Sequence, residues 1–401
     1  MSAHVLPIES WHKILRHATY SHHLLDPEWI HHPGDNLWVG WDTRTLPGTH
    51  IATQIAVSQK TKRSAMLVCR TWRELGTEFL YEAIRVPLQR DRILQLLDAI
   101  KQSSSGIEVG WWVKRLHCSV RSMDKSHAII SSLLEHCPNL QTFILTSKSW
   151  FYSTSKSYTE ETLQSQCSRS LRRLDVLLDD PTFVRSTMYA ELLSHISLTS
   201  LSITLRGPIL NLPAHSSFES ISTLTLYMPH GSFRVPLNMG TAYFPNLRTL
   251  ALDNFSNDEI TELALFVGKH QNTLLYLRLQ PAEPECDFLL LLSQALNIRS
   301  LALPDSGFAT IGRLVSRSAA RLRLAAITHI GLLRNRGSGH IIPTPASMQR
   351  IIDMGIFPGL KSIYLDSKVD SLDIRLIIGP LEAALLKHGI RLEYAPRAET
   401  R

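Results

Sequence analysis

The chain has 401 residues, of which 44% are hydrophobic and 19% charged, a composition that excludes a disordered or fibrous protein and predicts several domains or a stack of repeats. The net charge of +7 would suit a nucleic-acid partner if the basic residues were clustered, but acids are mixed among them almost throughout, so nucleic acid is not the expected partner. Neither a membrane span nor a signal peptide is expected from the hydropathy, and five scattered cysteines without a C-x-x-C pair predict a reducing cytoplasmic or nuclear setting.

The first predicted helix covers residues 7–17. Pro7 suits the first turn, where its missing N–H costs nothing, and Glu9 suits the positive end of the helix dipole. From Ile8 onward, apolar residues recur at three- and four-residue steps and give the helix one apolar face. A short amphipathic helix cannot close a core alone, so this face must contact the rest of the chain or another protein.

About forty residues, from 19 to 59, separate this helix from the next predicted one. They contain three tryptophans, which is too aromatic a composition for a disordered linker and predicts a loop folded against the helices. The pairs His22-His23 and His31-His32 raise the question of a zinc site. Because no cysteine lies near them, exposed loop histidines are the preferred interpretation, and neither a metal site nor a cofactor is expected.

A second helix is predicted to begin at Thr61 as its N-cap. One side of this helix is apolar, and after Gly76 the apolar pattern continues through Phe79 and Leu80 to Ala83. Like the first helix, it needs a partner for this side. The apolar residues of the side are Ala65, Val68, Cys69, Trp72 and Leu75.

The two ends of this region resemble an F-box. The resemblance rests on Leu6-Pro7-Ile8-Glu9 with Ile14-Leu15 and on the later run LVCRTWREL at 67–75, in which V-C-R-x-W-R is the specific part. It implies that residues 1–85 form a helical module, with 19–59 as an insertion, that docks on a Skp-type adaptor and through it on a cullin ligase core. Similarly interrupted F-box-like proteins are common in mushroom-forming fungi. The adaptor-binding residues that the resemblance implies are Leu6, Pro7, Ile8, Ile14, Leu15, Val68, Cys69, Trp72 and Leu75.

After a connecting helix in residues 86–112, one short phrase recurs from residue 113, with apolar residues at its first, fourth and sixth positions. Successive starts lie about 23 to 31 residues apart up to Ile298, a spacing typical of leucine-rich repeats. Helical stretches lie between the phrases, so each repeat is predicted to be a strand followed by a helix. The phrases begin at Val113, Leu140, Leu171, Leu198, Ile221, Leu247, Leu274, Ile298 and Leu360.

The predicted fold is therefore α/β, a helical F-box-like module followed by an irregular leucine-rich-repeat solenoid over 113–401, with a curved parallel sheet and outer helices. A compact, doubly wound α/β domain is the alternative, because it also alternates strands and helices. The repetition of one phrase favours the solenoid. A loop is expected in the Gly- and Pro-containing stretch 334–345, and a helix at 376–387 with a strand at 390–394 is expected to cap the end.

The interleaved positions of each strand are expected to face the concave surface of the solenoid, where a target protein would bind. Tyrosine and arginine are frequent hot-spot residues at protein interfaces. A plain solvated sheet face is the alternative. The expected target contacts are Tyr227, Asp253, Tyr276, Arg278 and Tyr364.

Residues 306–352 contain arginines but no acidic residue, unlike the rest of the chain. Arg313, Arg317 and Arg321, at four-residue steps, are expected to share one helix face. They suit an acidic or phosphorylated target, or alternatively nucleic acid, and an ordinary solvated stripe is the third interpretation.

None of the common phosphate-loop, zinc-protease, nucleophile-elbow or dinucleotide-binding motifs occurs in the sequence. No catalytic residue is assigned, and the chain is not expected to be an enzyme. The predicted function is the substrate-recognition adaptor of an SCF-type ubiquitin ligase. The alternative is an interaction scaffold without ligase docking, in which the N-terminal helices only cap the solenoid.

Overall fold

The computed structural model describes residues 6–19, 49–86, 89–104, 106–120, 126–147, 162–178, 197–205, 217–227, 242–282, 288–304, 310–311, 323–333, 345–365 and 372–394. The chain divides into two compact units. The first unit holds residues 1–29, 45–180 and 187–200, and the second holds residues 30–44, 181–186 and 201–401.

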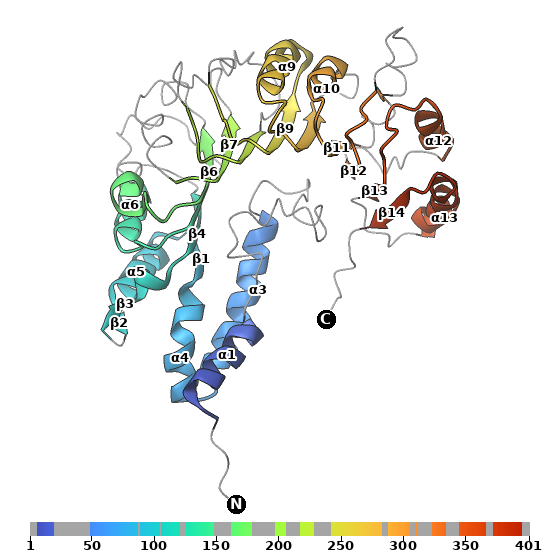
Figure 1. The fold of residues 1–401 in the computed structure, drawn as a ribbon. Coiled ribbons are helices and arrows are strands. Elements are labelled where there is room, and N and C mark those ends of the chain that lie inside the picture. The colour runs from blue at the N-terminus through green and yellow to red at the C-terminus, as the bar shows by residue number, and fades with distance from the viewer. Residues whose placement is uncertain are drawn as a thin grey trace, which may run out of the picture. The chain divides into compact units, whose positions relative to one another are not determined.

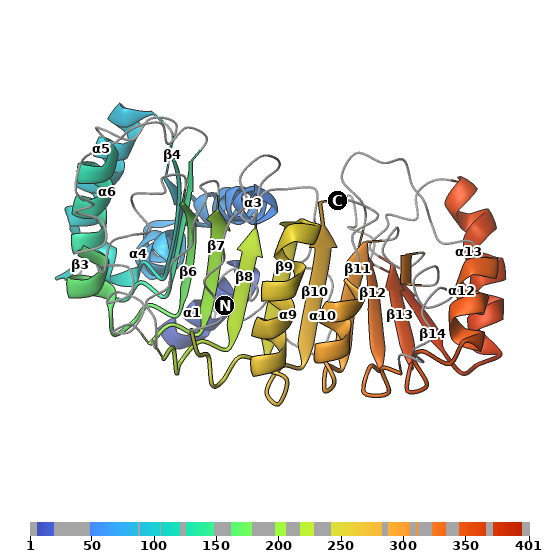
Figure 2. The ribbon, with the colours of Figure 1, turned by 90° about the horizontal axis from the view of Figure 1, so that it is seen from above.

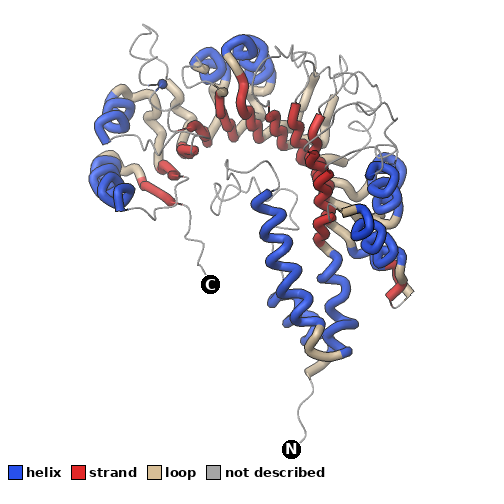
Figure 3. Tube along the Cα trace, turned by 180° about the vertical axis from the view of Figure 1, so that it is seen from behind, coloured by secondary structure: helices blue, strands red, loops and turns tan. Residues whose placement is uncertain are grey.

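Within the described residues, 12 strands form one parallel sheet in the order β1-β4-β5-β6-β7-β8-β9-β10-β11-β12-β13-β14. Apart from a small hairpin of β2 (Ser103–Ser104) and β3 (Ile107–Glu108), strands that follow one another in the chain are neighbours in the sheet. Figure 3 shows the strands of each unit side by side in a row. A doubly wound sheet reverses its strand order part-way. The doubly wound alternative is therefore wrong, and the α/β fold with a parallel sheet is confirmed.

Three helices precede the sheet in the first unit: α1 (Ile8–Thr19), α3 (Thr49–Met66) and α4 (Arg70–Tyr81). The helix predicted for residues 7–17 is confirmed as α1. The single helix predicted from Thr61 is wrong. Thr61 lies inside α3, where its hydroxyl donates to the Val57 carbonyl oxygen, and the helical conformation is interrupted between the end of α3 and the start of α4. Cys69 caps α4, with extended backbone angles and a thiol that accepts the amide proton of Trp72. Because sulfur is a weak acceptor, cysteine is not among the usual N-cap residues, and this cap was not predicted.

The insertion expected over 19–59 includes the first turns of α3, so its last part is helix and not loop. Residues 20–48, with both histidine pairs, lie outside the described residues.

Strands of the first unit pair in parallel, and Ile84, Leu116, Phe143 and Leu174 stand side by side in one buried row. Figure 1 shows helices α5 (Arg90–Lys101) and α6 (Ser126–Glu135) on one side of these strands and α3 on the other. Helix α5 lies within the stretch 86–112 for which a connecting helix was predicted. The strands are β1 (Ala83–Val86), β4 (Arg115–Val120), β5 (Thr142–Ser147) and β6 (Arg173–Leu178); short turns lie at η2 (Val109–Trp112) and η3 (Leu163–Cys167). Of the next strand, β7 (Ser200–Leu205), the first residue belongs to the first unit and the others to the second.

The second unit continues the same pattern, with its helices beside the strands in Figure 2. Strand β12 and helix α12 lie in the region between Leu303 and Leu360, where the sequence rhythm falters. The predicted C-terminal helix and strand are confirmed as α13 and β14. The strands are β8 (Thr223–Tyr227), β9 (Thr249–Phe255), β10 (Tyr276–Pro281), β11 (Ser300–Pro304), β12 (His329–Leu333), β13 (Ser362–Leu365) and β14 (Arg391–Tyr394); the helices are η5 (Asn257–Glu259), α9 (Ile260–Lys269), α10 (Leu289–Gln294), α12 (Pro345–Asp353) and α13 (Leu372–Leu386).

One hydrogen-bond pattern recurs where the strands begin. The amides of Gln141 and Thr142 both donate to the carbonyl oxygen of Lys114, and the next repeat donates in the same way to the carbonyl oxygen of Gln141. In the second unit, the carbonyl oxygens of Arg248, Leu275 and Arg299 each accept two amides from the following repeat. Buried backbone groups must be paired, and this pattern pairs them without a side-chain ladder.

Candidate functional site

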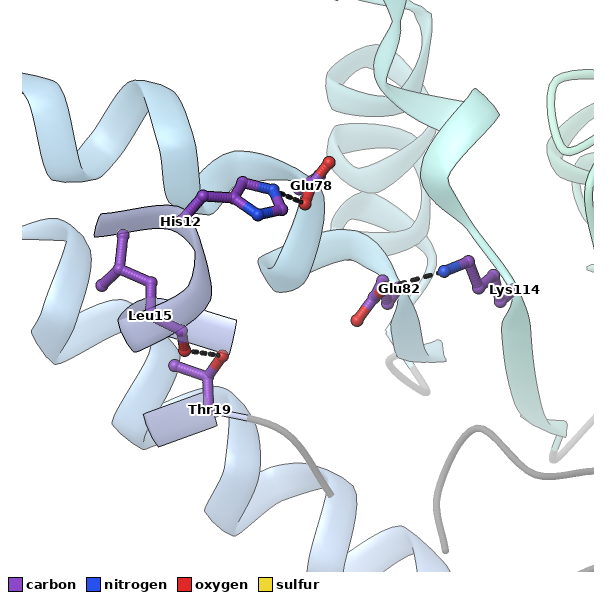
Figure 4. Close-up of polar contacts among 6 residues, drawn as sticks. All are labelled: His12, Leu15, Thr19, Glu78, Glu82 and Lys114. Carbon is purple, nitrogen blue, oxygen red and sulfur yellow. Dashed lines mark hydrogen bonds and ion pairs between the residues drawn. The ribbon is translucent and has the colours of Figure 1, made fainter. Parts of the chain in front are cut away.

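Helix α1 packs against α4 through aromatic and polar contacts. The ring centroids of Trp11 and Trp72 lie 5.4 Å apart, and those of His12 and Phe79 lie 4.9 Å apart. Figure 4 shows His12 reaching α4, where its Nε2 lies 2.5 Å from Glu78 Oε1. These contacts fix the orientation of α1 on the module.

Several large apolar side chains near the two tryptophans remain open to solvent. Ile8 is 55% exposed, Val68 is 63% exposed and Leu67 is 78% exposed. Ile8 and Ile14 lie three residues before and after Trp11 on one face of α1. Val68 lies in the link just before α4, and the Trp11–Trp72 contact joins α1 to the first turn of α4. We call the exposed and half-buried apolar side chains in and just before α1, in the α3–α4 link and in the first turn of α4 the docking patch: Leu6, Ile8, Trp11, Ile14, Leu67, Val68 and Trp72.

Most of the predicted adaptor-binding residues lie on or beside this patch. Trp72 and Leu75 are half-buried, whereas Leu15 is only 1% exposed. Leu15 is therefore a packing residue of the module, which can support the docking face from inside but does not form its surface. The exposed members of the predicted set are Leu6, Pro7, Ile8, Ile14, Val68 and Cys69.

Trp11 and Leu67 belong to the patch but were absent from the predicted set. Trp11 already stood on the apolar face of the first predicted helix, so its spacing from Ile8 and Ile14 was the available signal. Leu67 gave no such signal, because the break between α3 and α4 was not predicted.

A polar cluster anchors these helices to the sheet. Lys114 Nζ lies 2.8 Å from Glu82 Oε1, as Figure 4 shows, and Gln59 on α3 donates to the carbonyl oxygen of Ala83 at 3.1 Å. Burial lowers the pKa of Lys62, the attraction of Glu82 opposes that shift, and the charge of Lys114 adds to it. The module is thus held to the first strand of the sheet through buried polar contacts.

Polar side chains on the strands of the first unit are buried. Arg173 donates to both carboxylate oxygens of Asp175 at 2.8 to 3.1 Å. Burial lowers the pKa of Arg115 to about 9, with Arg173 adding to the shift, and burial with the charge of Arg115 lowers the pKa of His117 to about 4. His117 is therefore neutral at pH 7. This cluster was not predicted to be buried.

The target surface predicted in the second unit is also largely buried. Arg278 pairs with Asp253 at 2.9 Å and donates to Gln280 at 3.2 Å. Tyr364 is 1% exposed, Tyr227 is buried, and Tyr276, whose pKa burial raises, is half-buried. The expected exposure of Tyr227, Asp253, Arg278 and Tyr364 is wrong, because strand alternation tells which face a residue occupies but not what packs over it. Their contact with a target stays a prediction.

Arg313, Arg317 and Arg321 lie outside the described residues. In the parts of the chain that the structure does describe, no group of three or more His, Cys, Asp or Glu residues could hold a metal ion. Over the same residues, no helix has the length and apolar character that crossing a membrane requires.

Comparison with known proteins identifies no family. No family model matches the chain, and no curated protein matches it. Among solved structures, one protein from Bacteroides fragilis is similar over 84% of this chain and 83% of its own, with 12% identity and a TM-score of 0.34. A likeness at that level is not evidence for a shared fold or function.

Proposed function

We propose that this chain is a substrate-recognition adaptor of an SCF-type ubiquitin ligase, acting in the cytoplasm or nucleus. In this proposal the N-terminal helices are an F-box-like module that docks on a Skp-type adaptor, and the strand repeats form a leucine-rich-repeat solenoid that binds a target protein, acidic or phosphorylated in character. The ligase core supplies the catalysis, and this chain supplies recognition.

The docking patch carries the proposal. Soluble proteins rarely gather exposed apolar side chains at one place unless something binds there. Burying one isoleucine or valine contributes roughly 1.5 to 3 kcal/mol relative to leaving it exposed, so an unpartnered patch forgoes several such contributions. The patch also coincides with the residues through which the resemblance to an F-box implies docking.

The alternative function is an interaction scaffold in which the helices only cap the repeats. It is favoured by the polar contacts of Gln59 and Lys114, which tie the helices to the sheet. A pure cap, however, would bury its apolar residues against the connecting segment 86–100. The Trp72 ring instead packs on Trp11, and Leu6 is exposed. These observations favour docking.

Co-purification of the full chain with a Skp-type adaptor tests the proposal. We expect the wild type to bind and the pair Leu6→Ala with Pro7→Ala, or Trp72→Ala alone, to lose at least tenfold in affinity, because exposed apolar anchors dominate interface energies. Leu290→Ala is the matched control, since this leucine is exposed on α10 of the second unit.

The variant Val68→Asp distinguishes a loss of adaptor binding from a loss of folding. Val68 is exposed, so a charge there should leave the circular dichroism spectrum and the unfolding midpoint unchanged while it abolishes adaptor binding. If a folded wild-type chain binds no adaptor, the ligase role is wrong and the scaffold becomes the better account.

A further inference from the structure

The helices that carry the docking patch have an uneven surface charge. Among described residues 6–19 and 49–82, six exposed side chains are cationic and two are acidic, Glu9 and Glu74. The other two carboxylates of these segments are engaged inside the module, Glu78 with His12 and Glu82 with Lys114. The exposed cations are Lys13, Arg16, Lys60, Arg63, Arg70 and Arg73.

Several of these cations lie close to the apolar residues in the sequence. Arg70 and Arg73 flank Trp72 in the first turn of α4, Lys13 precedes Ile14 on α1, and Arg63 lies in the last turn of α3 before Leu67. One of them, Arg70, is paired with Glu74 at 2.9 Å on the surface. Protein interfaces commonly place an apolar centre inside a polar rim. The exposed side chains of these segments combine apolar residues with an excess of positive charge, which suits an interface of this kind.

We infer that the docking patch is built for an acidic partner protein, one that presents an apolar groove edged by carboxylates. The inference rests on the proposed docking function and adds to it the chemistry of the partner. Opposite charges around an apolar centre steer the encounter and raise the association rate, while the apolar contacts set the dissociation rate.

A protein groove fits the patch better than an anionic lipid surface. A helix that lies on a membrane turns its whole apolar face outward. Leu15 of α1 is instead buried inside the module, and Trp11 is half-buried with its ring on Trp72 of α4. The remaining apolar groups come from α1, from Leu6 just before it and from the link between α3 and α4. Separate apolar anchors on a fixed scaffold suit a partner with matching pockets.

The test measures association and dissociation rates of the full chain with a purified Skp-type adaptor at low and high salt. The double variant Arg63→Glu with Arg73→Glu should slow association by about tenfold or more at low salt and leave dissociation nearly unchanged. The difference should vanish near 1 M salt, where the screening length is about 3 Å. The matched control is Arg299→Glu with Arg391→Glu, two exposed arginines of the second unit, which should associate like the wild type.

Each remaining outcome overturns the inference. If the wild type binds the adaptor at a rate that neither salt nor the charge reversal changes, the partner is not acidic, and the docking function survives alone. If no adaptor binds but vesicles of phosphatidylserine and phosphatidylcholine bind, and Val68→Asp abolishes that binding, the occupant is a lipid surface and both proposals are wrong. If the folded chain binds neither probe, both also fail.

Discussion

His117 is a buried histidine, and its burial disfavours the protonated form. Burial and the neighbouring charge of Arg115 lower its pKa from 6.5 to about 4, so folded His117 holds a proton less tightly than the same residue in the unfolded chain. A group with a lowered folded pKa makes the free energy of unfolding fall as the pH drops. The fall is expected between pH 6.5 and about 4, with no contribution above about pH 7.

His117→Gln should therefore make the acid-induced loss of stability shallower. The change removes a contribution of up to about 3 kcal/mol between pH 6.5 and 4, since one pKa unit corresponds to about 1.4 kcal/mol. Urea unfolding at several pH values measures it, and the curves of variant and wild type should run parallel from pH 7 to 8. Equal slopes below pH 6 would show that His117 is not the titrating group.

Two neighbouring residues of α1 should respond differently to truncation. Leu15 is buried, so Leu15→Ala should lower the free energy of unfolding by about 2 to 5 kcal/mol. Ile14 is exposed, and Ile14→Ala should change it by no more than about 0.5 kcal/mol while weakening adaptor binding. Both residues are apolar, and their sequence does not show which of the two is buried. Denaturation of the two variants, with the wild type beside them, separates packing from docking, and equal losses of stability would contradict the assignment.

At the scale of elements, the repeated phrase predicted the strands well because its three apolar positions coincide with the buried row of the sheet. Strand β12 escaped prediction although Ile327, Ile330 and Leu332 follow the same spacing, since an insertion-rich stretch surrounds it. Strand β1 was not predicted, because the first position of its phrase is occupied by Tyr81 and not by an aliphatic residue. Burial of the interleaved residues could not be predicted, because it depends on segments distant in the sequence.

The turn η2 is held tightly between neighbouring elements. A Cβ atom added at Gly110 would lie 1.9 Å from the His136 carbonyl oxygen and 2.7 Å from Ile100 Cγ2. Gly110→Ala should therefore force backbone movement and lower the free energy of unfolding by about 1 to 3 kcal/mol.

Gly76→Ala is the matched control for this prediction. The added Cβ would meet the flexible end of Met66 at 2.5 Å, and alanine favours the α4 helix by up to about 1 kcal/mol over glycine. We expect the two effects nearly to cancel in a thermal or urea unfolding curve. A Gly110→Ala variant as stable as Gly76→Ala would contradict the tight packing of η2.

At the scale of the whole molecule, the sequence predicted best the residues that serve both packing and the proposed function. It predicted worst which residues serve only one of the two. Periodicity identified the apolar face of the first helix, but half of that face packs and half remains exposed. The F-box-like run includes the exposed residues Val68 and Cys69 of the α3–α4 link, although the helix boundary itself was missed. Each unit has its own core, and the docking patch lies within the first, so variants of the patch should leave the second unit unaffected.

The paired amide contacts at the strand starts depend on the backbone alone. Each repeat donates two amides to one backbone carbonyl oxygen of the preceding repeat, as at Lys114 and Gln141, and every amino acid has that carbonyl group. These hydrogen bonds require neither a particular side chain nor a fixed length of the segment between two contacts. Such a chain can lengthen, shorten or rewrite its intervening segments during evolution without losing register, which is consistent with repeat spacings that vary by several residues while the sheet stays continuous within each unit.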